Sequence, residues 1–113
     1  MTTSRNFQLQ GKYTRYEDGF QIGFDCAGRH GNYKTFEAAV KAAKKGMKRN
    51  ECEPVMKVVE VRNARGRIER EDWYDRSGNL IAIGDIKKYS IWHIDGYKII
   101  DRTTLEVLWE VEA

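Results

Sequence analysis

Several features that mark particular protein classes are scarce in this 113-residue sequence. It has one proline, no internal repeat and no linker-like stretch, so we expect one domain over residues 1–113, with residues 1–10 as a polar arm. No apolar run approaches the roughly 20 residues of a membrane-spanning helix, and the first residues lack the apolar core of a signal peptide. These absences predict a cytoplasmic protein that does not contact membranes.

Cysteine and histidine, the usual zinc ligands, number only two each. Cys26 and Cys52 form no CxxC pair, and we expect both to be free thiols in a reducing compartment. Zinc ligands usually come in pairs at short spacing, but only Cys26 and His30 lie close together, while Cys52 and His93 are isolated. Cys26 also continues the apolar positions of a predicted strand. We therefore predict no metal and no cofactor.

The clearest local pattern predicts a helix over residues 35–49. Thr35 is a suitable N-cap, and the apolar residues that follow recur at helical spacing as a thin stripe built largely from alanine. A thin stripe allows a sheet to approach closely. Gly46 costs about 1 kcal/mol inside a helix, which indicates either a frayed or a tightly packed last turn.

The segments around this helix are typical of strands and turns. Before it, residues 12–16 and the alternating residues 20–26 flank Glu17-Asp18-Gly19, which predicts a hairpin. After it, residues 55–62 are apolar on both faces, as expected of a central strand. A turn over residues 63–66 leads to a more polar strand over residues 67–75. A second turn at residues 76–79 leads to a strand over residues 80–83, and residues 84–88 form a helical turn or a loop.

Two further features complete the predicted sheet. Asp95-Gly96 between residues 89–94 and 97–101 is the pattern of a two-residue hairpin turn. The last strand, residues 105–111, is expected to turn its alternate apolar side chains inward, namely Leu105, Val107, Trp109 and Val111. The predicted fold class is α+β, with one amphipathic helix on a mostly antiparallel sheet of about seven short strands, arranged as ββα followed by a β-meander.

The stretches GFQIGFD, KTFEAAVKAAKKG, VMKVVEVRN and ARGRIERED follow one another between residues 19 and 74. In this order they resemble a family of short bacterial ββαββ domains of unknown function. Arg65-Gly66 stands where that family has Asp-Gly, and the last 40 or so residues lie outside the resemblance. The resemblance implies the ββαββ fold and no activity. The architecture is also similar to the DNA-binding arms of phage integrases, which pack one helix on a small sheet.

Charge is unevenly distributed along the chain. Residues 34–49 carry six Lys/Arg against one Glu, whereas residues 95–113 carry two Lys/Arg against five Asp/Glu. A basic helix beside an Arg-rich hairpin over residues 62–70 would form one nucleic-acid-binding surface. The carboxylates of Glu69, Glu71 and Asp72 reduce the positive charge of that hairpin. A net charge of +3 is also low for a nucleic-acid-binding protein. The candidate basic residues are Lys34, Lys41, Lys44, Lys45, Lys48, Arg49, Arg65 and Arg67.

Aromatic residues supply the other candidate surface. Three Trp and six Tyr exceed what one thin-sided helix can cover, so we expect some to be exposed as anchors for a protein partner. The alternative is that they fill the core of a curled sheet. The candidates are Trp73, Tyr74, Trp92 and Tyr97. The acidic C-terminal part, with Glu106, Glu110 and Glu112, would suit a basic partner, and an exposed edge strand would allow a homodimer.

Catalysis has the weakest support in the sequence. A hydrolase or nuclease would use His30 in the loop AGRHGN, with His93 or a carboxylate, but no third group to orient the histidine is apparent. We therefore predict a small non-catalytic interaction protein that binds a protein partner. Proteins of this size without an active-site pattern are often accessory proteins or inhibitors carried by phages and mobile elements. Nucleic-acid binding is the alternative.

Overall fold

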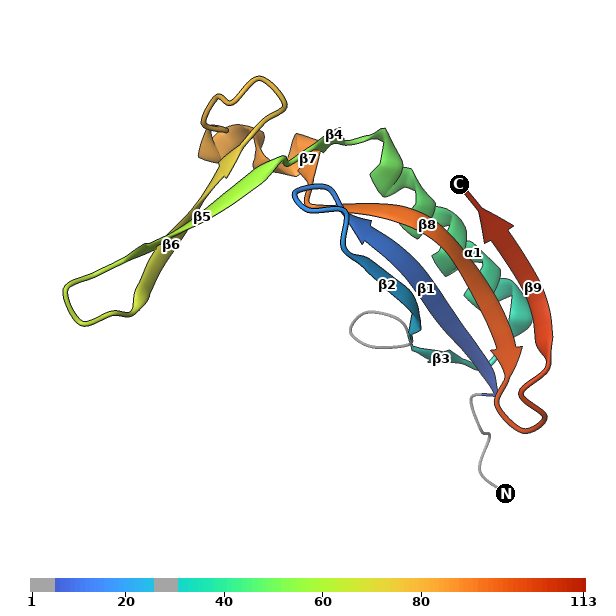
Figure 1. Cartoon of the computed structure of the whole chain (residues 1–113). Helices are drawn as coiled ribbons and strands as arrows, with labels where there is room; N and C mark the ends of the chain where they lie inside the picture. Colours follow the sequence, from blue (N-terminus) through green and yellow to red (C-terminus); the bar gives the residue numbers. More distant parts are fainter. Residues whose placement is uncertain (1–5, 26–30) are drawn as a thin grey trace.

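The computed structural model describes residues 6–25 and 31–113 and confirms the predicted fold class (Figure 1). Within these residues there are one α-helix, α1 (Phe36–Met47), and nine strands that pair mostly antiparallel. The strands divide into a main sheet with α1 on one face, a two-stranded hairpin that projects from it, and a short parallel pair between the two.

The main sheet is built around β1, which pairs on both of its sides. One side pairs with β2 and β3, and the other pairs with β8 along the whole of β1, from Phe7 opposite Asp101 to Arg15 opposite Trp92. β8 then pairs with β9. The five strands are β1 (Phe7–Arg15), β2 (Gln21–Asp25), β3 (Asn32–Tyr33), β8 (Trp92–Asp101) and β9 (Val107–Glu112). Residues 7–10 were expected in a polar arm but belong to β1, because Leu9 is fully buried in the core.

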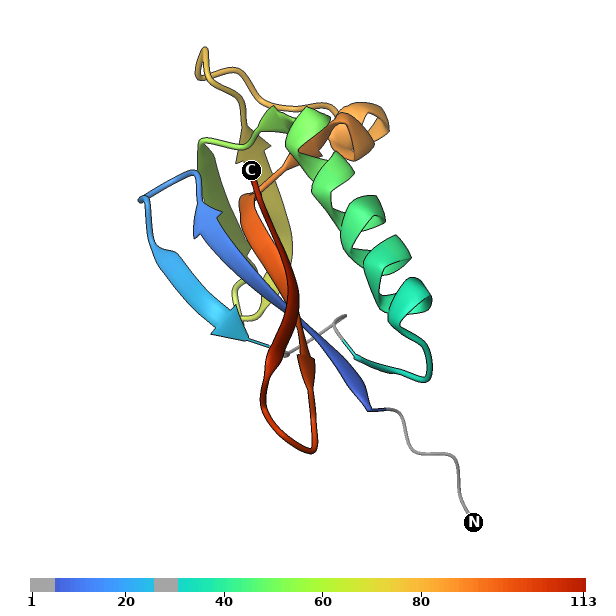
Figure 2. The same cartoon turned by 90° about the vertical axis from the view of Figure 1, so that its right-hand side faces the viewer.

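Helix α1 packs on one face of this sheet and leaves the other face open (Figure 2). Thr35 caps the helix as predicted, since its Oγ1 accepts a hydrogen bond of 3.2 Å from the backbone N–H of Ala38. The thin stripe predicted from the sequence is buried at Ala39 and Ala43. Small side chains let the helix approach the buried residues of β1 and β8, which include Leu9 and Ile99.

Gly46 marks the closest contact between helix and sheet. A Cβ atom added to Gly46 would lie 2.2 Å from the Tyr97 hydroxyl oxygen and 2.7 Å from the ring carbon that bears it. The last turn is therefore tightly packed, which is one of the two alternatives left open by the sequence. Tyr97 is 3% exposed.

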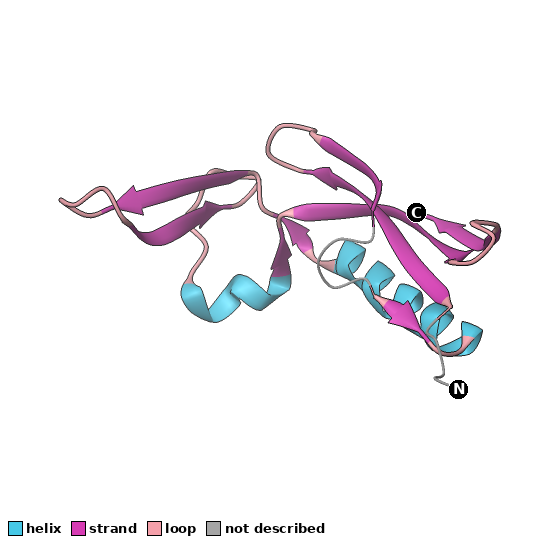
Figure 3. Cartoon of the chain, turned by 90° about the horizontal axis from the view of Figure 1, so that it is seen from below, coloured by secondary structure: helices cyan, strands magenta, loops and turns pink. Residues whose placement is uncertain are grey.

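Residues 55–62 do not form the central strand predicted from their valines. β5 (Lys57–Arg62) and β6 (Ile68–Tyr74) form a separate hairpin that projects away from the main sheet (Figures 1 and 3). The turn over residues 63–66 is confirmed, because the Asn63 side-chain oxygen accepts hydrogen bonds from the backbone of Arg65 and Arg67, and Gly66 has a φ of 76°. The resemblance over residues 19–74 thus covers elements of three different sheets.

A small second core joins the hairpin to the main sheet. β4 (Glu53–Pro54) follows the 3₁₀-helix η1 (Lys48–Glu51) and pairs in parallel with β7 (Tyr89–Ser90). Val55, Ile81 and Ser90 are buried there. The strand predicted over residues 80–83 is reduced to one bridge between Leu80 and Tyr74, and the chain continues as the 3₁₀-helix η2 (Ile83–Lys88), the predicted helical turn.

The hairpin predicted at Asp95-Gly96 does not form. Both residues lie inside the continuous strand β8, where Lys12 of β1 pairs with Gly96, Tyr13 pairs with Ile94, and Asp95 is the extra residue of a β-bulge. A Cβ on Gly96 would lie 2.6 Å from the backbone oxygen of Val111, so the glycine permits close pairing with β9. Asp-Gly suits a bulge as well as a turn, and only long-range pairing distinguishes them.

Of the four apolar side chains predicted to point inward from the last strand, two do so. Trp109 and Val111 pack against the main core, but Leu105 and Val107 are 71% and 45% exposed. Leu105 lies in the turn before β9 with a φ of 63°, so its side chain cannot follow the strand alternation.

The molecule is more extended than its size requires. Its Cα radius of gyration is 17.2 Å and its extents are 54 × 32 × 25 Å, whereas a compact chain of this length has a radius of gyration of about 13 Å. Its accessible surface is 8056 Å², compared with about 6,400 Å² for a typical monomer of this mass. The projecting hairpin produces much of this elongation (Figure 3).

The contact between Gly46 and Tyr97 generates a prediction about stability. Helix propensity alone favours Gly46→Ala by about 1 kcal/mol. The overlap with Tyr97 opposes it, and we expect a net loss of about 1 kcal/mol or more in the free energy of unfolding, measured by urea denaturation. In a Tyr97→Leu background the same change should be neutral or stabilising, and equal effects of Gly46→Ala in both backgrounds would contradict the packing described.

Candidate interaction surfaces

The first candidate surface is the β5–β6 hairpin, on whose faces no other element of the described residues forms a layer. Lys57, Val59 and Val61 of β5 share one face with Tyr74, Asp72 and Arg70 of β6, because directly paired residues point to the same side. Both strands are edges, since within the described ranges they pair only with each other apart from the bridge at Leu80. Isolated two-stranded hairpins are marginally stable in water, so this one depends on its base.

Apolar side chains are exposed along the hairpin and at its base. Ile68 at the turn end is 50% exposed, Leu80 beside Tyr74 is 59% exposed and Ile83 at the start of η2 is 89% exposed. Met56, at the start of the hairpin, donates its backbone N–H to the Tyr74 carbonyl and is also exposed. These residues contribute no buried core and leave apolar area in contact with water.

The charges of the hairpin largely neutralise one another. Residues 57–72 carry five Lys/Arg against four Asp/Glu. Arg62 pairs with Glu60 at 2.8 Å and Arg70 pairs with Asp72 at 3.1 Å, each along its own strand. Glu60 and Glu71 lie directly opposite each other, an arrangement that is destabilising in an isolated sheet. The hairpin is therefore mixed in charge, and only the turn with Arg65 and Arg67 is mainly basic.

The second candidate surface is the basic face of α1 and of the two 3₁₀-helices that adjoin its C-terminal end. All six cations predicted there are exposed, and Lys87 and Lys88 of η2 extend the face, since the Lys87 carbonyl lies 4.0 Å from the Cys52 sulfur that follows η1. The basic face consists of Lys34, Lys41, Lys44, Lys45, Lys48, Arg49, Lys87 and Lys88. Nothing in the local sequence marked Lys87 and Lys88 as its members.

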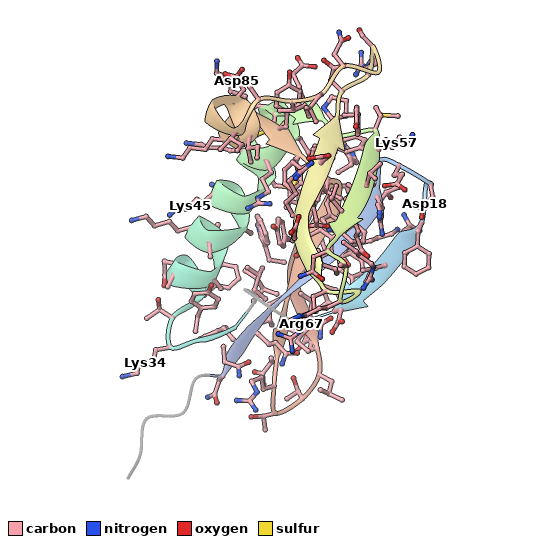
Figure 4. The ribbon with its side chains drawn as sticks, turned by 90° about the vertical axis from the view of Figure 1, so that its left-hand side faces the viewer. Asp18, Lys34, Lys45, Lys57, Arg67 and Asp85 are labelled. Atoms are coloured by element: carbon pink, nitrogen blue, oxygen red, sulfur yellow. The ribbon has the colours of Figure 1, made fainter. Side chains whose placement is uncertain are left out.

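The structure does not join the Arg-rich turn to the basic helix. The base of the hairpin follows the C-terminal end of α1, but its turn lies at the far end of β5, about 20 Å away at the usual rise per residue. The turn of the hairpin and α1 accordingly lie on well-separated parts of the molecule (Figure 1). Figure 4 shows Arg67 and Lys45 on these separate elements. The single surface expected from all eight predicted basic residues does not exist in this conformation.

The four predicted aromatic anchors have different environments. The prediction that Tyr97 is exposed as an anchor is wrong, because its side chain is buried against Gly46 in the main core. Trp92 is half-buried and packs edge-on against Tyr13, with ring centroids 6.4 Å apart. Trp73 and Tyr74 are half-buried at the base of the hairpin, where the Lys57 ammonium lies 5.7 Å from the Tyr74 ring centroid.

Three glutamates lie in or directly before the edge strand β9. Glu106, Glu110 and Glu112 are exposed, as expected for the acidic C-terminal part, and Glu110 lies opposite Lys98. Charged side chains on an edge strand oppose uncontrolled pairing with other chains. The homodimer expectation thus has less support at β9 than at the hairpin.

One cluster of titratable side chains lies at the end of the open sheet face. The Tyr16 hydroxyl is 3.4 Å from Nδ1 of His93, whose Nε2 is 3.7 Å from the Asp95 carboxylate. Asp95 also accepts hydrogen bonds from Thr14 and Gln21. Burial raises the pKa of Tyr16, and the negative charges of Cys52 and Asp95 when ionised add to this rise while Arg76 opposes it. A tyrosine with a raised pKa stays protonated at neutral pH and is a poor base.

The structure describes little of the residues considered above for metal binding and catalysis. His30 and Cys26 lie outside the described residues. In the described part of the chain no three His, Cys, Asp or Glu side chains gather as a metal site would require, and no helix has the length and apolarity to cross a membrane.

Comparison with protein families, curated proteins and solved structures found no match to this chain.

The isolation of the hairpin generates a second prediction. Because nothing in residues 6–25 and 31–113 forms a layer over residues 58–72, their backbone amides should exchange with deuterium at least roughly tenfold faster than the paired amides of β1 and β8. Residue-resolved hydrogen exchange by NMR measures this directly. Equal protection in both sheets would contradict the prediction and would indicate that another molecule covers the hairpin in solution.

Proposed function

We propose that this protein is a small non-catalytic protein that binds a protein partner through the β5–β6 hairpin, as an accessory protein or an inhibitor would. The observation that carries the proposal is the projection of this hairpin from the main sheet (Figure 1). Among the described residues its faces carry no second layer, and its strand edges are occupied only near the base, where Glu17 accepts from the Val58 N–H and Ile81 donates to the Trp73 carbonyl. An ordered element that buries little of its own surface gains stability when a partner covers it.

The character of the hairpin supports a protein partner over nucleic acid. A β-ribbon that enters a DNA groove lies among phosphates, which repel carboxylates. Four carboxylates on residues 57–72 would meet such a backbone. Exposed Leu80 beside half-buried Tyr74 at the base, with exposed Ile68 at the turn end, instead resembles the mixture of apolar and polar groups that protein interfaces present.

The exposed strand edges suggest how the partner would bind. Beyond the base, where Val58 and Trp73 already have partners, β5 and β6 each offer backbone N–H and C=O groups along their outer sides. An added strand would satisfy these groups. Side chains on the two faces of the hairpin would then provide specificity. A second copy of this chain is one such partner, and its binding would give a homodimer.

A different observation supports nucleic-acid binding as a second candidate function. The eight cations of the basic face are exposed, and within the described residues only Lys88 among them forms an ion pair, with Asp85. Such a face would attract a phosphate backbone without involving the hairpin. The two functions would therefore use separate surfaces and respond to different variants.

Substitution of exposed apolar side chains tests whether the hairpin is the binding surface. In affinity capture from a source lysate, Ile68→Thr/Leu80→Thr should reduce recovery of a defined partner at least roughly tenfold, because both side chains are largely exposed and a buried apolar contact is lost. Threonine keeps the β-branched shape that strands favour. Val107→Thr/Leu108→Thr, which removes two exposed apolar side chains from β9, is the matched control and should leave recovery unchanged.

Charge reversal on α1 and η1 distinguishes nucleic-acid binding by the basic face from protein binding by the hairpin. Lys44→Glu/Lys45→Glu/Lys48→Glu should not affect capture of a hairpin-bound protein partner. If instead the unmodified protein retains a DNA and RNA pool near physiological salt and this variant releases it, the basic face is the functional surface and the hairpin proposal is wrong.

A further inference from the structure

Helix α1 covers β8 and the neighbouring part of β1 but leaves a pocket beside β2. This pocket has a volume of about 730 Å³, within the usual range of small-molecule sites. Its apolar floor includes Leu9 and Ile94 from the central strands and Ile22 from β2. The lining side chains come from α1, from η1 and from the four strands β1, β2, β3 and β8, so the walls belong to the main folded unit.

Four aromatic rings form the walls of the pocket. Tyr13 is central, because its ring centroid lies 6.4 Å from that of Trp92 and 6.3 Å from that of Tyr97, both edge-to-face. Tyr33 adds a fourth ring to the lining. Tyr97 is buried, whereas Tyr13, Tyr33 and Trp92 are half-buried and keep part of each ring accessible. Rings at these angles favour insertion of another flat ring, which can stack on one ring and meet the edge of the next.

Two cations stand on the helix side of the pocket. Lys45 and Arg49 are one helical turn apart, line the pocket and are exposed at its mouth. Burial raises the pKa of the Tyr97 hydroxyl, and the Arg49 guanidinium partly offsets this rise, which places the positive charge of Arg49 near the aromatic wall. Asp25 lies on the β2 side, so among the described lining residues two positive charges stand against one negative charge.

We propose that this pocket binds a planar aromatic molecule that carries one anionic group. The ring enters between the aromatic walls, and the anionic group remains at the mouth with Lys45 and Arg49. A cationic ligand would meet two like charges, and an uncharged ring would leave both cations without a counter-ion. This site is separate from the hairpin, so its presence does not depend on the proposed partner binding.

A matched pair of fluorescent naphthalenes tests the proposal. 8-Anilinonaphthalene-1-sulfonate supplies a planar naphthalene ring with an anionic sulfonate, and N-phenyl-1-naphthylamine has the same rings without the sulfonate. Titration of the full chain with the sulfonate should give one saturable site. Lys45→Gln/Arg49→Gln should weaken it roughly tenfold, whereas binding of the neutral probe should change less than about twofold.

Two further variants make the outcome decisive. Asp25→Asn should strengthen sulfonate binding, since it removes the negative charge on the opposite wall. Lys34→Gln/Lys48→Gln removes the same amount of charge from exposed positions that do not line the pocket, and should change sulfonate binding less than about twofold. Absence of a saturable site, or equal weakening by both double variants, would overturn the proposal.

Discussion

The pairing of β1 with β8 is the constraint on which the rest of the structure depends. It joins residues more than 75 positions apart, from Phe7 opposite Asp101 to Arg15 opposite Trp92. Helix α1 packs across these two strands through Ala39 and Ala43, and Gly46 lets the Tyr97 ring fit beneath the last turn. β2, β3 and β9 then add to the outer sides of this pair. The aromatic pocket lies where the helix stops covering the sheet.

This arrangement explains why the middle of the chain projects. After α1 the next strand of the main sheet is β8, so the chain from β4 to β7 has no position in that sheet. Its apolar residues are divided between a small core around Val55 and Ile81 and the exposed side chains of the hairpin. The same division that leaves the hairpin uncovered makes it the candidate surface for a partner. The basic face and the hairpin remain separate.

Features set by local interactions were predictable from the sequence. The N-cap at Thr35, the β1–β2 hairpin and the turn at Asn63 each depend on side chains within a few residues, and each forms as predicted. Long-range pairing decided the others. Asp95-Gly96 became a bulge because β1 and β9 pair on both sides of it, and valine-rich β5 was placed outside the main sheet. The exposure of the basic side chains was predictable, but their separation from Arg65 and the burial of Tyr97 depend on tertiary packing.

The central claim is that the hairpin projects freely from an otherwise ordinary helix-on-sheet domain. Small-angle X-ray scattering of the monomer at several concentrations tests it most directly. The structure predicts a radius of gyration near its Cα value of 17.2 Å, with an elongated particle. A value close to the roughly 13 Å of a compact chain of this length would contradict it, because the hairpin would then lie folded against the sheet.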